Sequence, residues 1–466
     1  MNQKFLPNLY FIFSVLLFLG ALSSCGNKAV VDSQTSQPKA EPSYTREDDR
    51  SATEEKTNYV DKDYLRYDDH IYKENIRTAQ LYVKNEPLSF PVIFMNDNKQ
   101  LQLHFDDMDQ EFHTYSYEFV HCNANWEPSL LAPQEYIKGF FNGFIEEYNY
   151  SFNTFFQYLH YQLEFPNQDI QFIKSGNYVL KVYANNDPAD LILTRRFFVA
   201  DKKISVEPRI KMATLARFRD YKQEVDLTLN LRNYPVVDPY TDLKVLIMQN
   251  RRWDNAISDL KPLFVRGDEL VYNYEDKNLF NGGNEFRFFD TKDLQYQSMN
   301  VDGIQIEQGK FNVWIIPEEP RSFKRYYFQN DINGQRLIKK NEAANSNKEA
   351  DYMYTYFTLK RETPLPNGDV YVFGELSEWQ FKKEFKMEYV AVEKEYRLKT
   401  ILKQGYYNYM YAFLPQGETE GDIAAIEGTH SETENNYYIL VYHRKQGEIY
   451  DRLIGFSLQN SNNTSN

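Results

Sequence analysis

Two groups of residues in the first third of the chain are of types that perform chemistry. His121 and Cys122 are adjacent, and a cysteine beside a histidine could supply a nucleophile and its base. Adjacent residues of a β-strand, however, point to opposite faces of the sheet, so the two side chains would not meet. Free cysteines are among the most buried residue types. We therefore predict a buried thiol at Cys122 rather than a catalytic dyad.

The second group is acidic. Asp106, Asp107 and Asp109 follow His104 closely, and hard cations such as calcium accept carboxylate ligands. The spacing is not that of an EF-hand loop, and the glycine that such a loop needs is missing. A strand end followed by an acidic turn explains these residues more simply. The seven histidines include no HxxxH pair and zinc has no cysteine pair, so we expect no metal and no cofactor.

Glycine-rich and nucleophile motifs give no active site either. No GxSxG, GxxxxGK or GxGxxG string occurs, which removes the common hydrolase, phosphate-loop and dinucleotide-binding classes. The loop Asn281–Glu285 contains two glycines, but a strand pattern follows it where a phosphate site needs a helix, so we expect a hairpin-type turn. We predict a non-enzymatic protein with no catalytic residues. The alternative is a site assembled from distant residues, which no motif reveals.

Cys25 is the one residue to which the sequence assigns a chemical role. Lys4 gives a positive end, and a largely apolar run from Leu9 to Leu22 follows. This run is shorter than a membrane span and reads as a signal peptide, residues 1–24. Leu22-Ser23-Ser24-Cys25 is a lipobox, which predicts lipidation of Cys25 and a stable membrane anchor through several acyl chains. The alternative is a conventional signal peptide followed by an incidental cysteine.

The residues after Cys25 predict on which side of the outer membrane the chain lies, and they predict a tether. Residues 26–31 contain no acid, whereas some surface lipoproteins carry an acidic run there. We therefore expect the chain at the periplasmic face of the outer membrane. Residues 25–69 are polar and rich in Ser, Thr, Glu, Asp and Lys, a composition that cannot bury enough apolar surface to fold. The expected structure of this segment is a flexible tether.

Composition narrows the class of the folded part. A chain of 466 residues is long enough for about three domains. Aromatic residues make up 16% of it, and Tyr and Phe favour strands. The net charge of −14 argues against nucleic acid as a partner, because phosphate binding needs a basic face. With Cys25 lipidated, Cys122 has no partner for a disulfide within the chain.

Apolar and polar residues alternate in many short segments. Examples are Leu101–Phe105, Tyr115–Phe119, Tyr178–Tyr183, Val225–Leu229, Lys244–Met248, Val370–Phe373 and Tyr407–Tyr411. Turn residues such as Asn96-Asp97 and Asn333-Gly334 separate them. Such spacing predicts an all-β chain of tandem immunoglobulin-like β-sandwiches. The expected domains are an N-terminal sandwich, a middle β domain, a C-terminal domain and a polar tail, at 70–200, 201–340, 341–456 and 457–466.

The C-terminal third resembles the early-set immunoglobulin-like module of glycogen-binding domains. The resemblance rests on Asp369–Trp379 and Gly405–Tyr411. In those modules the tryptophan that matches Trp379 helps to stack on glucan, together with a second aromatic after the last hairpin. Here that stretch is Pro415–Glu420 and has no aromatic, which argues against glycan binding. A glycan-binding outer-membrane lipoprotein nevertheless remains the alternative function, since the chain has many aromatics.

Between Leu81 and Gly455 the chain resembles one family throughout, the plug proteins of the type IX secretion system. The matching strings, in order, are Leu88–Pro91, His121–Trp126, Tyr150–Thr154, Ser175–Tyr178, Leu193–Phe197, Gln249–Ala256, Leu263–Leu270, Gly282–Arg287, Glu427–His430, Glu432–Asn435 and Tyr450–Gly455. The resemblance implies a periplasmic protein that occludes the periplasmic mouth of SprA, a very large outer-membrane β-barrel, when no substrate is in transit. It carries over no catalytic residues and does not say which surface meets the barrel.

The anchor can be tested by substitution. Cys25→Ala removes the thiol that would accept the diacylglycerol, so the variant should move from the membrane to the soluble fraction, because the remaining chain has no acyl group to insert. Fractionation with mass spectrometry of the wild type measures both. A wild type without lipid mass and a variant that still sediments with membranes would together contradict the lipobox assignment.

Overall fold

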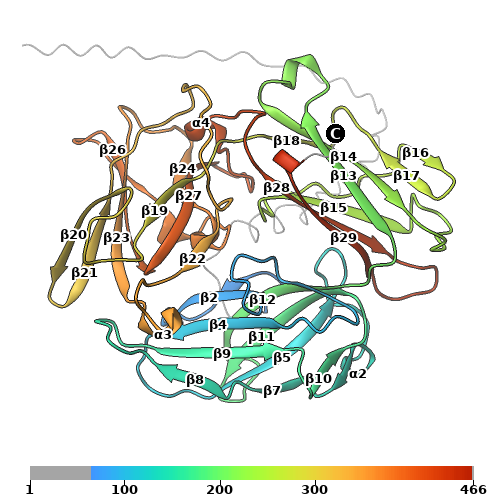
Figure 1. Cartoon of the computed structure of the whole chain (residues 1–466), viewed down its shortest axis with the longest axis horizontal. Helices are drawn as coiled ribbons and strands as arrows, with labels where there is room; N and C mark the ends of the chain where they lie inside the picture. Colours follow the sequence, from blue (N-terminus) through green and yellow to red (C-terminus); the bar gives the residue numbers. More distant parts are fainter. Residues whose placement is uncertain (1–64, 464–466) are drawn as a thin grey trace, which may run out of the picture. The chain divides into compact units, whose positions relative to one another are not determined.

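β-strands, mostly antiparallel, account for nearly all regular structure between residues 65 and 463, the part of the chain that this computed structural model describes (Figure 1). The predicted all-β class with tandem β-sandwiches is confirmed. Cys25, the signal peptide and residues 25–64 of the expected tether lie outside the described residues. The helices within the range are single turns: α2 (Pro133–Tyr136), α3 (Ser346–Glu349), α4 (Ala424–Glu427), η1 (Ala216–Phe218), η2 (Glu375–Ser377), η3 (Lys383–Phe385) and η4 (Ser461–Asn463). None of the helices described has the length and apolar character needed to cross a membrane.

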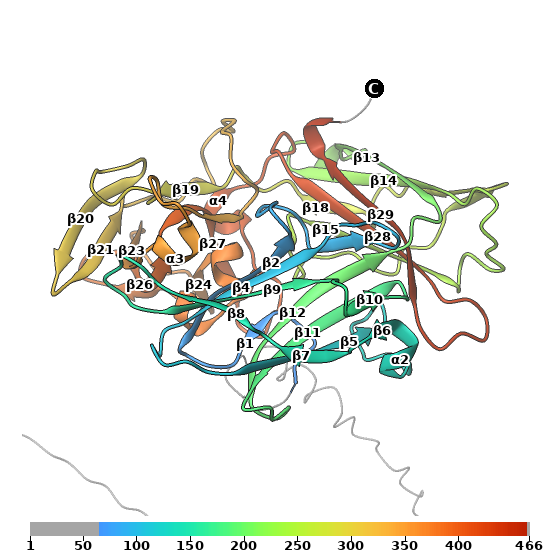
Figure 2. The ribbon, with the colours of Figure 1, turned by 60° about the horizontal axis from the view of Figure 1, so that its bottom comes forward.

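The first module is a sandwich made from residues 70–200. One sheet has the order β1-β12-β11-β5-β7, with β3 parallel to β12, and the other has the order β2-β4-β9-β8. The strands are β1 (His70–Ile71), β2 (Ile76–Val83), β3 (Val92–Phe94), β4 (Leu101–Asp107), β5 (Tyr115–Cys122), β6 (Ile137–Gly139), β7 (Asn142–Phe144), β8 (Glu147–Tyr150), β9 (Leu159–Phe165), β10 (Ile170–Phe172), β11 (Gly176–Ala184) and β12 (Leu191–Ala200). The short pair β6–β10 lies beside α2 at one end of β5 (Figure 2).

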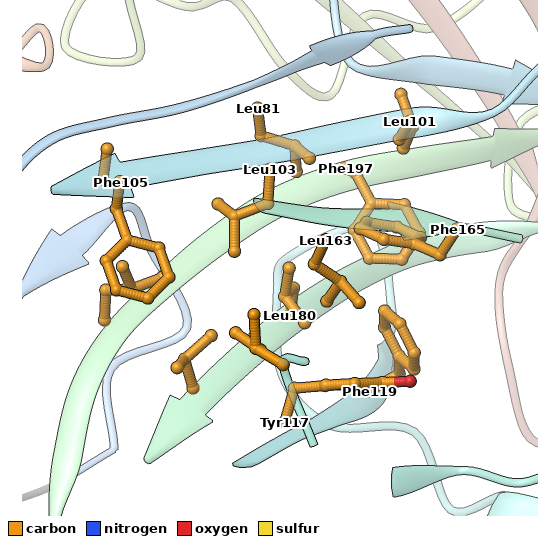
Figure 3. Packing of buried hydrophobic residues seen from close by; sticks show 14 of the residues in the cluster. Leu81, Leu101, Leu103, Phe105, Tyr117, Phe119, Leu163, Phe165, Leu180 and Phe197 are labelled. Atoms are coloured by element: carbon orange, nitrogen blue, oxygen red, sulfur yellow. The ribbon is translucent and has the colours of Figure 1, made fainter. Parts of the chain in front are cut away.

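Alternating side chains of the two sheets fill the core of the first module. Leu103 and Phe105 from β4 meet Phe119 from β5 and Phe197 from β12 between the sheets (Figure 3). All nine residues of β11 are buried, because the outer face of this sheet is covered as well. A strand buried on both faces reads as an apolar run rather than as a clean alternation.

The second module covers that outer face and takes strands from two distant parts of the chain. The sheet β13-β14-β17-β16, with β18 on β14, packs against the sheet β15-β28-β29. In Figure 1, β28 and β29, coloured red, lie beside β15. The strands are β13 (Ser205–Met212), β14 (Lys222–Asn230), β15 (Leu243–Gln249), β16 (Phe264–Arg266), β17 (Glu269–Tyr272), β18 (Leu279–Asn281), β28 (Asn436–His443) and β29 (Arg452–Asn460).

The third module contains the strands in between. The sheet β20-β21-β23-β26-β25 packs against β19-β27-β22, and β24 extends along β27. The strands are β19 (Arg287–Asp290), β20 (Val301–Glu307), β21 (Lys310–Ile315), β22 (Arg336–Ile338), β23 (Tyr352–Lys360), β24 (Gly368–Phe373), β25 (Glu388–Val390), β26 (Glu395–Lys403) and β27 (Gly405–Pro415).

Strand pairing does not follow the domain limits that the sequence suggested. Strands β19 to β21 lie in the expected middle domain, 201–340, yet they pair with strands of the third module. Strands β28 and β29 lie largely in the expected C-terminal domain, 341–456, yet they complete the second module, and β29 continues into the expected polar tail. The polar stretch Lys339–Lys348 is the connection from β22 to α3 inside one module, not a linker between domains.

The start of the described chain is fixed to the fold. Arg196 donates from Nε to the Tyr67 carbonyl at 2.7 Å and from its backbone to Asp69 Oδ1 at 2.7 Å. Its guanidinium lies 4.2 Å from the ring centroid of Trp126 and 4.7 Å from that of Trp253. The expected tether, 25–69, therefore ends earlier than the sequence suggested, because its last residues bond to β12.

Removing the returning strands tests this architecture. A chain ending at Glu434 lacks β28 and β29, which leaves β15 unpaired and uncovers the outer face of β11 and β12. We expect the cooperative thermal transition to be lost, because the core between the two sheets of the second module contributes most of its stability and includes residues of β28 and β29. Circular dichroism melting measures it, and a chain lacking only residues 464–466 is the control. A cooperative transition at an unchanged temperature in the short chain would show that the returning strands are dispensable.

Candidate functional site

Exposed aromatic side chains concentrate in one segment of the first module. Phe140, Phe144, Tyr150 and Phe152 are between 53% and 68% exposed, far more than the aromatic side chains of the cores. Tyr148 in the same segment packs on exposed Phe112 with ring centroids 4.7 Å apart. We call these six residues the aromatic edge. Soluble proteins rarely expose apolar surface in such a run unless another molecule covers it.

The aromatic edge coincides with the free margins of both sheets. Strand β7 is the outermost strand of one sheet and β8 is the outermost strand of the other, and every residue of β8 is exposed. A Cβ atom at Gly143 would lie 2.8 Å from the hydroxyl of Tyr117, its partner on the neighbouring strand β5, so glycine at this position leaves room for the tyrosine ring. Edge strands carry unpaired backbone groups to which a partner can bind.

A groove of about 650 Å³ runs along this margin, and its charge is one-sided. Phe140 and Phe144 line it together with four carboxylates, and no lysine or arginine contributes to its wall. The carboxylates belong to Glu146, Glu147, Glu164 and Asp169, of which Glu164 is paired with Lys84 at 2.5 Å. Aromatic and acidic groups in this combination fit a partner surface that offers apolar and cationic side chains.

Among the residues singled out from the sequence, His121 and Cys122 lie on opposite faces of β5. The His121 ring bonds Ser129 Oγ at 2.9 Å and the Ser175 carbonyl at 3.2 Å, whereas Cys122 packs in the core between the first and second modules. Burial raises the pKa of the Cys122 thiol to about 12, so it stays protonated. The predicted buried thiol is confirmed.

The side chains of the acidic group do not come together as a set of cation ligands. Strand β4 ends at Asp107 and a turn follows, as expected, with the Asp109 N–H donating to Asp107 Oδ1 at 3.0 Å. Asp107 also accepts hydrogen bonds from Asn75 and Tyr115, while neighbouring Asp106 belongs to a separate cluster. No set of three potential metal ligands occurs in residues 65–463.

Asp106 is the centre of a buried ionic cluster between the first and third modules. Its carboxylate lies 2.5 Å from Lys403 Nζ, 2.6 Å from the Tyr352 hydroxyl and 2.7 Å from His160 Nδ1. The Asp106 and Lys403 side chains are each 1% exposed. Burial would raise the pKa of Asp106, but the Lys403 ammonium and His160 lower it overall, so the carboxylate is ionised. We call these four residues the ionic junction.

His104 extends the ionic junction by one ring. Its Nδ1 lies 2.9 Å from His160 Nε2, and the two rings stack at 5.1 Å. Burial and the neighbouring His160 lower the pKa of His104 to about 3, so it is neutral at physiological pH. The group that the sequence presented as a possible cation site therefore connects two modules.

The glycine-rich loop is not a hairpin, contrary to the expectation. Strand β18 before it pairs with β14 of the second module, whereas β19 after it pairs with β27 of the third. A Cβ at Gly282 would lie 1.9 Å from the His430 carbonyl oxygen. Glycine at position 282 allows this close approach of two backbones. Turn-forming residues in the sequence do not predict such a contact.

Trp379 is unavailable for stacking on a sugar. It is 9% exposed and packs edge-on against Phe286 and Phe373 in a small cluster. The early-set resemblance around β24 and β27 thus concerns the fold, because the tryptophan that would stack on a sugar lies in a buried cluster.

No pattern in the sequence indicates the aromatic edge, the ionic junction or the packing of Arg196 between Trp126 and Trp253. The run Phe140-Phe141-Asn142-Gly143-Phe144 interrupts the usual alternation, which was the available hint of an exposed edge. Lys403 stands at a position of its strand where the alternation predicts a solvent-facing side chain, so its sequence context does not distinguish it from a surface lysine.

Comparison with known proteins gives one match to a family model over part of the chain and one to a solved structure over most of it. Residues 76–201 match the family model described as the first domain of the type 9 secretion system plug protein. The crystal structure of a hypothetical protein from Parabacteroides merdae is similar with a TM-score of 0.83 and 34% sequence identity, covering 85% of this chain and 100% of that chain. The likeness therefore extends well beyond the residues of the family model. No curated protein matches.

The histidines whose pKa is lowered in the folded chain predict a pH dependence of stability. Burial is the main cause that lowers the pKa of His70 to about 4, of His104 to about 3 and of His121 to about 4. In the unfolded chain each titrates near pH 6.5, so the unfolded state binds more protons between these values. The free energy of unfolding should therefore fall as the pH decreases from about 7 toward 4, by up to about 1.4 kcal/mol per pH unit for each histidine.

Urea unfolding at several pH values measures this slope. His104→Asn should reduce it, since one of the six histidines whose pKa is lowered in the folded chain is removed. Gln102→Ala on the same strand removes a buried polar group that does not titrate, so it should lower stability without changing the slope. An unchanged slope in His104→Asn would show that the ring does not titrate on unfolding.

Proposed function

This chain belongs to the plug protein family of the type IX secretion system, and from this premise we propose that it is a non-enzymatic stopper of the translocon SprA. It would occlude the periplasmic opening of that barrel when no substrate is in transit. A lipid on Cys25 would hold it at the periplasmic face of the outer membrane. The family and the all-β fold both support a structural rather than a catalytic role.

The observation that carries the proposal is the aromatic edge. A stopper works by binding, and its contact surface must be exposed in the free protein. Aromatic anchors supply most of the energy of typical interfaces, and they do so best where neighbouring groups exclude water. Phe140 and Phe144 flank an acidic groove, and the free strands β7 and β8 add backbone donors and acceptors. We propose this margin as the surface that meets the barrel.

Reversible occlusion sets a requirement on affinity. The stopper must bind the idle barrel better than the barrel occupied by cargo, because a ligand with equal affinity for two states shifts no equilibrium between them. A lipid anchor would keep the local concentration high near the membrane, so that modest intrinsic affinity suffices.

Substitution of the aromatic edge tests the proposal. The double variant Phe140→Ser, Phe144→Ser should copurify with SprA about tenfold less than wild type, because two exposed anchors are lost while the core stays intact. Affinity purification from mildly extracted membranes measures this. The matched control is Phe323→Ser, Tyr327→Ser, which removes two aromatics that are 77% and 79% exposed in the third module.

Permeability gives the functional readout. Deleting the gene should make the outer membrane leakier to large hydrophilic dyes, and the double variant of the aromatic edge should resemble the deletion. A folded cargo trapped in the barrel should displace the wild-type protein. Absence of any association with a large barrel, together with unchanged permeability in the deletion strain, would refute the stopper.

A further inference from the structure

The connection from β21 to β22 in the third module exposes a second group of aromatic side chains. This connection, residues 316–335, contains no strand or helix. Phe323 and Tyr327 are 77% and 79% exposed, and Phe328 is 46% exposed. We call residues 323–328 the basic aromatic loop, because a lysine and an arginine lie between these aromatics. Exposed apolar side chains this close together indicate a surface that another molecule covers.

The charge of this loop is opposite to that of the chain, whose net charge is −14. No acidic residue occurs between Glu319 and Asp331. Lys324 and Arg325 are exposed, and neither side chain makes an ion pair or hydrogen bond with any of residues 65–463. The loop therefore presents two uncompensated cations beside its aromatic rings, whereas the groove at the aromatic edge is acidic.

The chain entering the loop is fixed to the third module. The backbone N–H groups of Arg321 and Ser322 donate to the Ile426 carbonyl at 2.8 and 3.0 Å. The Arg321 guanidinium also lies 2.6 Å from the buried Glu427 carboxylate. A Cβ at Gly428 would lie only 3.1 Å from the Ser322 Cα, so the two backbones are in close contact. The loop thus starts from a rigid base.

The middle and the far end of the loop are fixed as well. The Tyr326 hydroxyl donates to the buried Glu285 carboxylate at 2.5 Å, and its ring lies 5.6 Å from that of His430. Beyond the loop, Asp331 accepts a hydrogen bond from the Phe286 N–H at 2.5 Å. Because the backbone is held on both sides and in the middle, the fold itself keeps the other aromatic side chains of the loop in water.

This composition is typical of segments that lie in the interface of a bilayer. Aromatic rings enter the headgroup region there, and basic side chains are attracted to anionic lipids. A protein partner fits less well, because lysine is depleted in the core of protein interfaces and the loop offers no strand edge for pairing. Nucleic acid fits less well, because the chain as a whole would repel its phosphates.

We infer that the basic aromatic loop binds the surface of a membrane that contains anionic phospholipid. The exposed rings enter the headgroup region, and the two cations contact lipid phosphates. Such a contact orients the fold on the membrane. A lipid on Cys25 would not do so, since a chain of the length that separates Cys25 from Leu65 spans up to about 130 Å when extended. The inference rests neither on that lipid nor on the proposed role at the translocon.

Binding to vesicles tests the contact. The protein to use is the chain from Gly26 onward, which lacks Cys25 and contains all of residues 65–463. It should cosediment with vesicles of phosphatidylcholine and phosphatidylglycerol at least about tenfold more strongly than with phosphatidylcholine alone, because each basic residue near an anionic surface strengthens binding about fivefold. Absence of binding, or equal binding to both kinds of vesicle, would overturn the inference.

Charge reversal assigns the lipid preference to the loop. Lys324→Glu, Arg325→Glu should abolish the preference for phosphatidylglycerol, because the loop then repels the anionic headgroups. The matched control is Lys394→Glu, Arg397→Glu, which changes the net charge equally at side chains that are 57% and 48% exposed near the β25–β26 turn. The control should bind as the unsubstituted chain does. Equal binding by the loop variant and the control would contradict the assignment.

The aromatic side chains are tested separately. Phe323→Ser, Tyr327→Ser should weaken binding to the mixed vesicles about tenfold or more, because two exposed rings no longer enter the interface. The same variant should still copurify with SprA from detergent extracts, where no bilayer remains. The membrane contact and the stopper therefore fail independently of each other. Unchanged vesicle binding in this variant would show that the rings do not contact lipid.

A fluorescent label distinguishes insertion into a bilayer from binding of a soluble anion. In the chain from Gly26 onward Cys122 is the one cysteine, and it is buried, so Phe323→Cys provides a single accessible thiol. An environment-sensitive fluorophore on this thiol should shift to the blue with the mixed vesicles but not with a single-stranded oligonucleotide. The control label on Val392→Cys, at a position that is 91% exposed, should not shift. No shift with vesicles, or a shift with the oligonucleotide, would overturn the lipid assignment.

Discussion

The buried pair of Asp106 and Lys403 is the constraint on which the contact between the first and third modules depends. Removing two charges from water costs several kcal/mol for each ion, and only close pairing with additional hydrogen bonds offsets this cost. The Tyr352 hydroxyl and His160 supply those bonds here. Separating the modules would leave both charges without partners, so the pair functions only in the assembled fold. It fixes the end of β4 against β26.

The contact between the first and second modules has a different basis. Val179 and Phe198, on the outer face of the first module, share a core with Leu440 and Leu453 from the returning strands. Apolar burial of this kind has no directional requirement. Hydrogen bonds such as that from the Tyr442 hydroxyl to Asn177 Oδ1, at 2.8 Å, add directional contacts across the same interface. Because the modules share buried contacts, stability is expected to be shared among them rather than additive.

The strands were predictable from the sequence, but their partners were not. Alternation placed Leu101–Phe105, Tyr178–Tyr183 and Tyr407–Tyr411 inside β4, β11 and β27, because side chains of a strand point to its two faces in turn. Each strand extends beyond the segment that the pattern marked. Alternation carries no information on which sheet a strand joins, and so the return of β28 to β15 was missed. Asp106 and Lys403 are 297 positions apart, and no local pattern links them. Phe140, between β6 and β7, and Phe105, in β4, are the same residue type, yet one is 66% exposed and the other fully buried.

The distribution of charge and aromatics bears on how a stopper could release. A deep pocket closing on a long anchor would bind tightly and leave slowly, since affinity differences between related complexes reside mainly in dissociation rates. The aromatic edge is instead a margin of two edge strands beside an open, acidic groove. Contacts there stay near water, so each contributes little and the sum remains modest. The proposed membrane anchor would raise the local concentration, so that modest affinity would be sufficient for occupancy and would permit exchange when cargo enters. A shallow contact surface on a body whose modules share buried contacts is therefore compatible with the reversible occlusion that we propose.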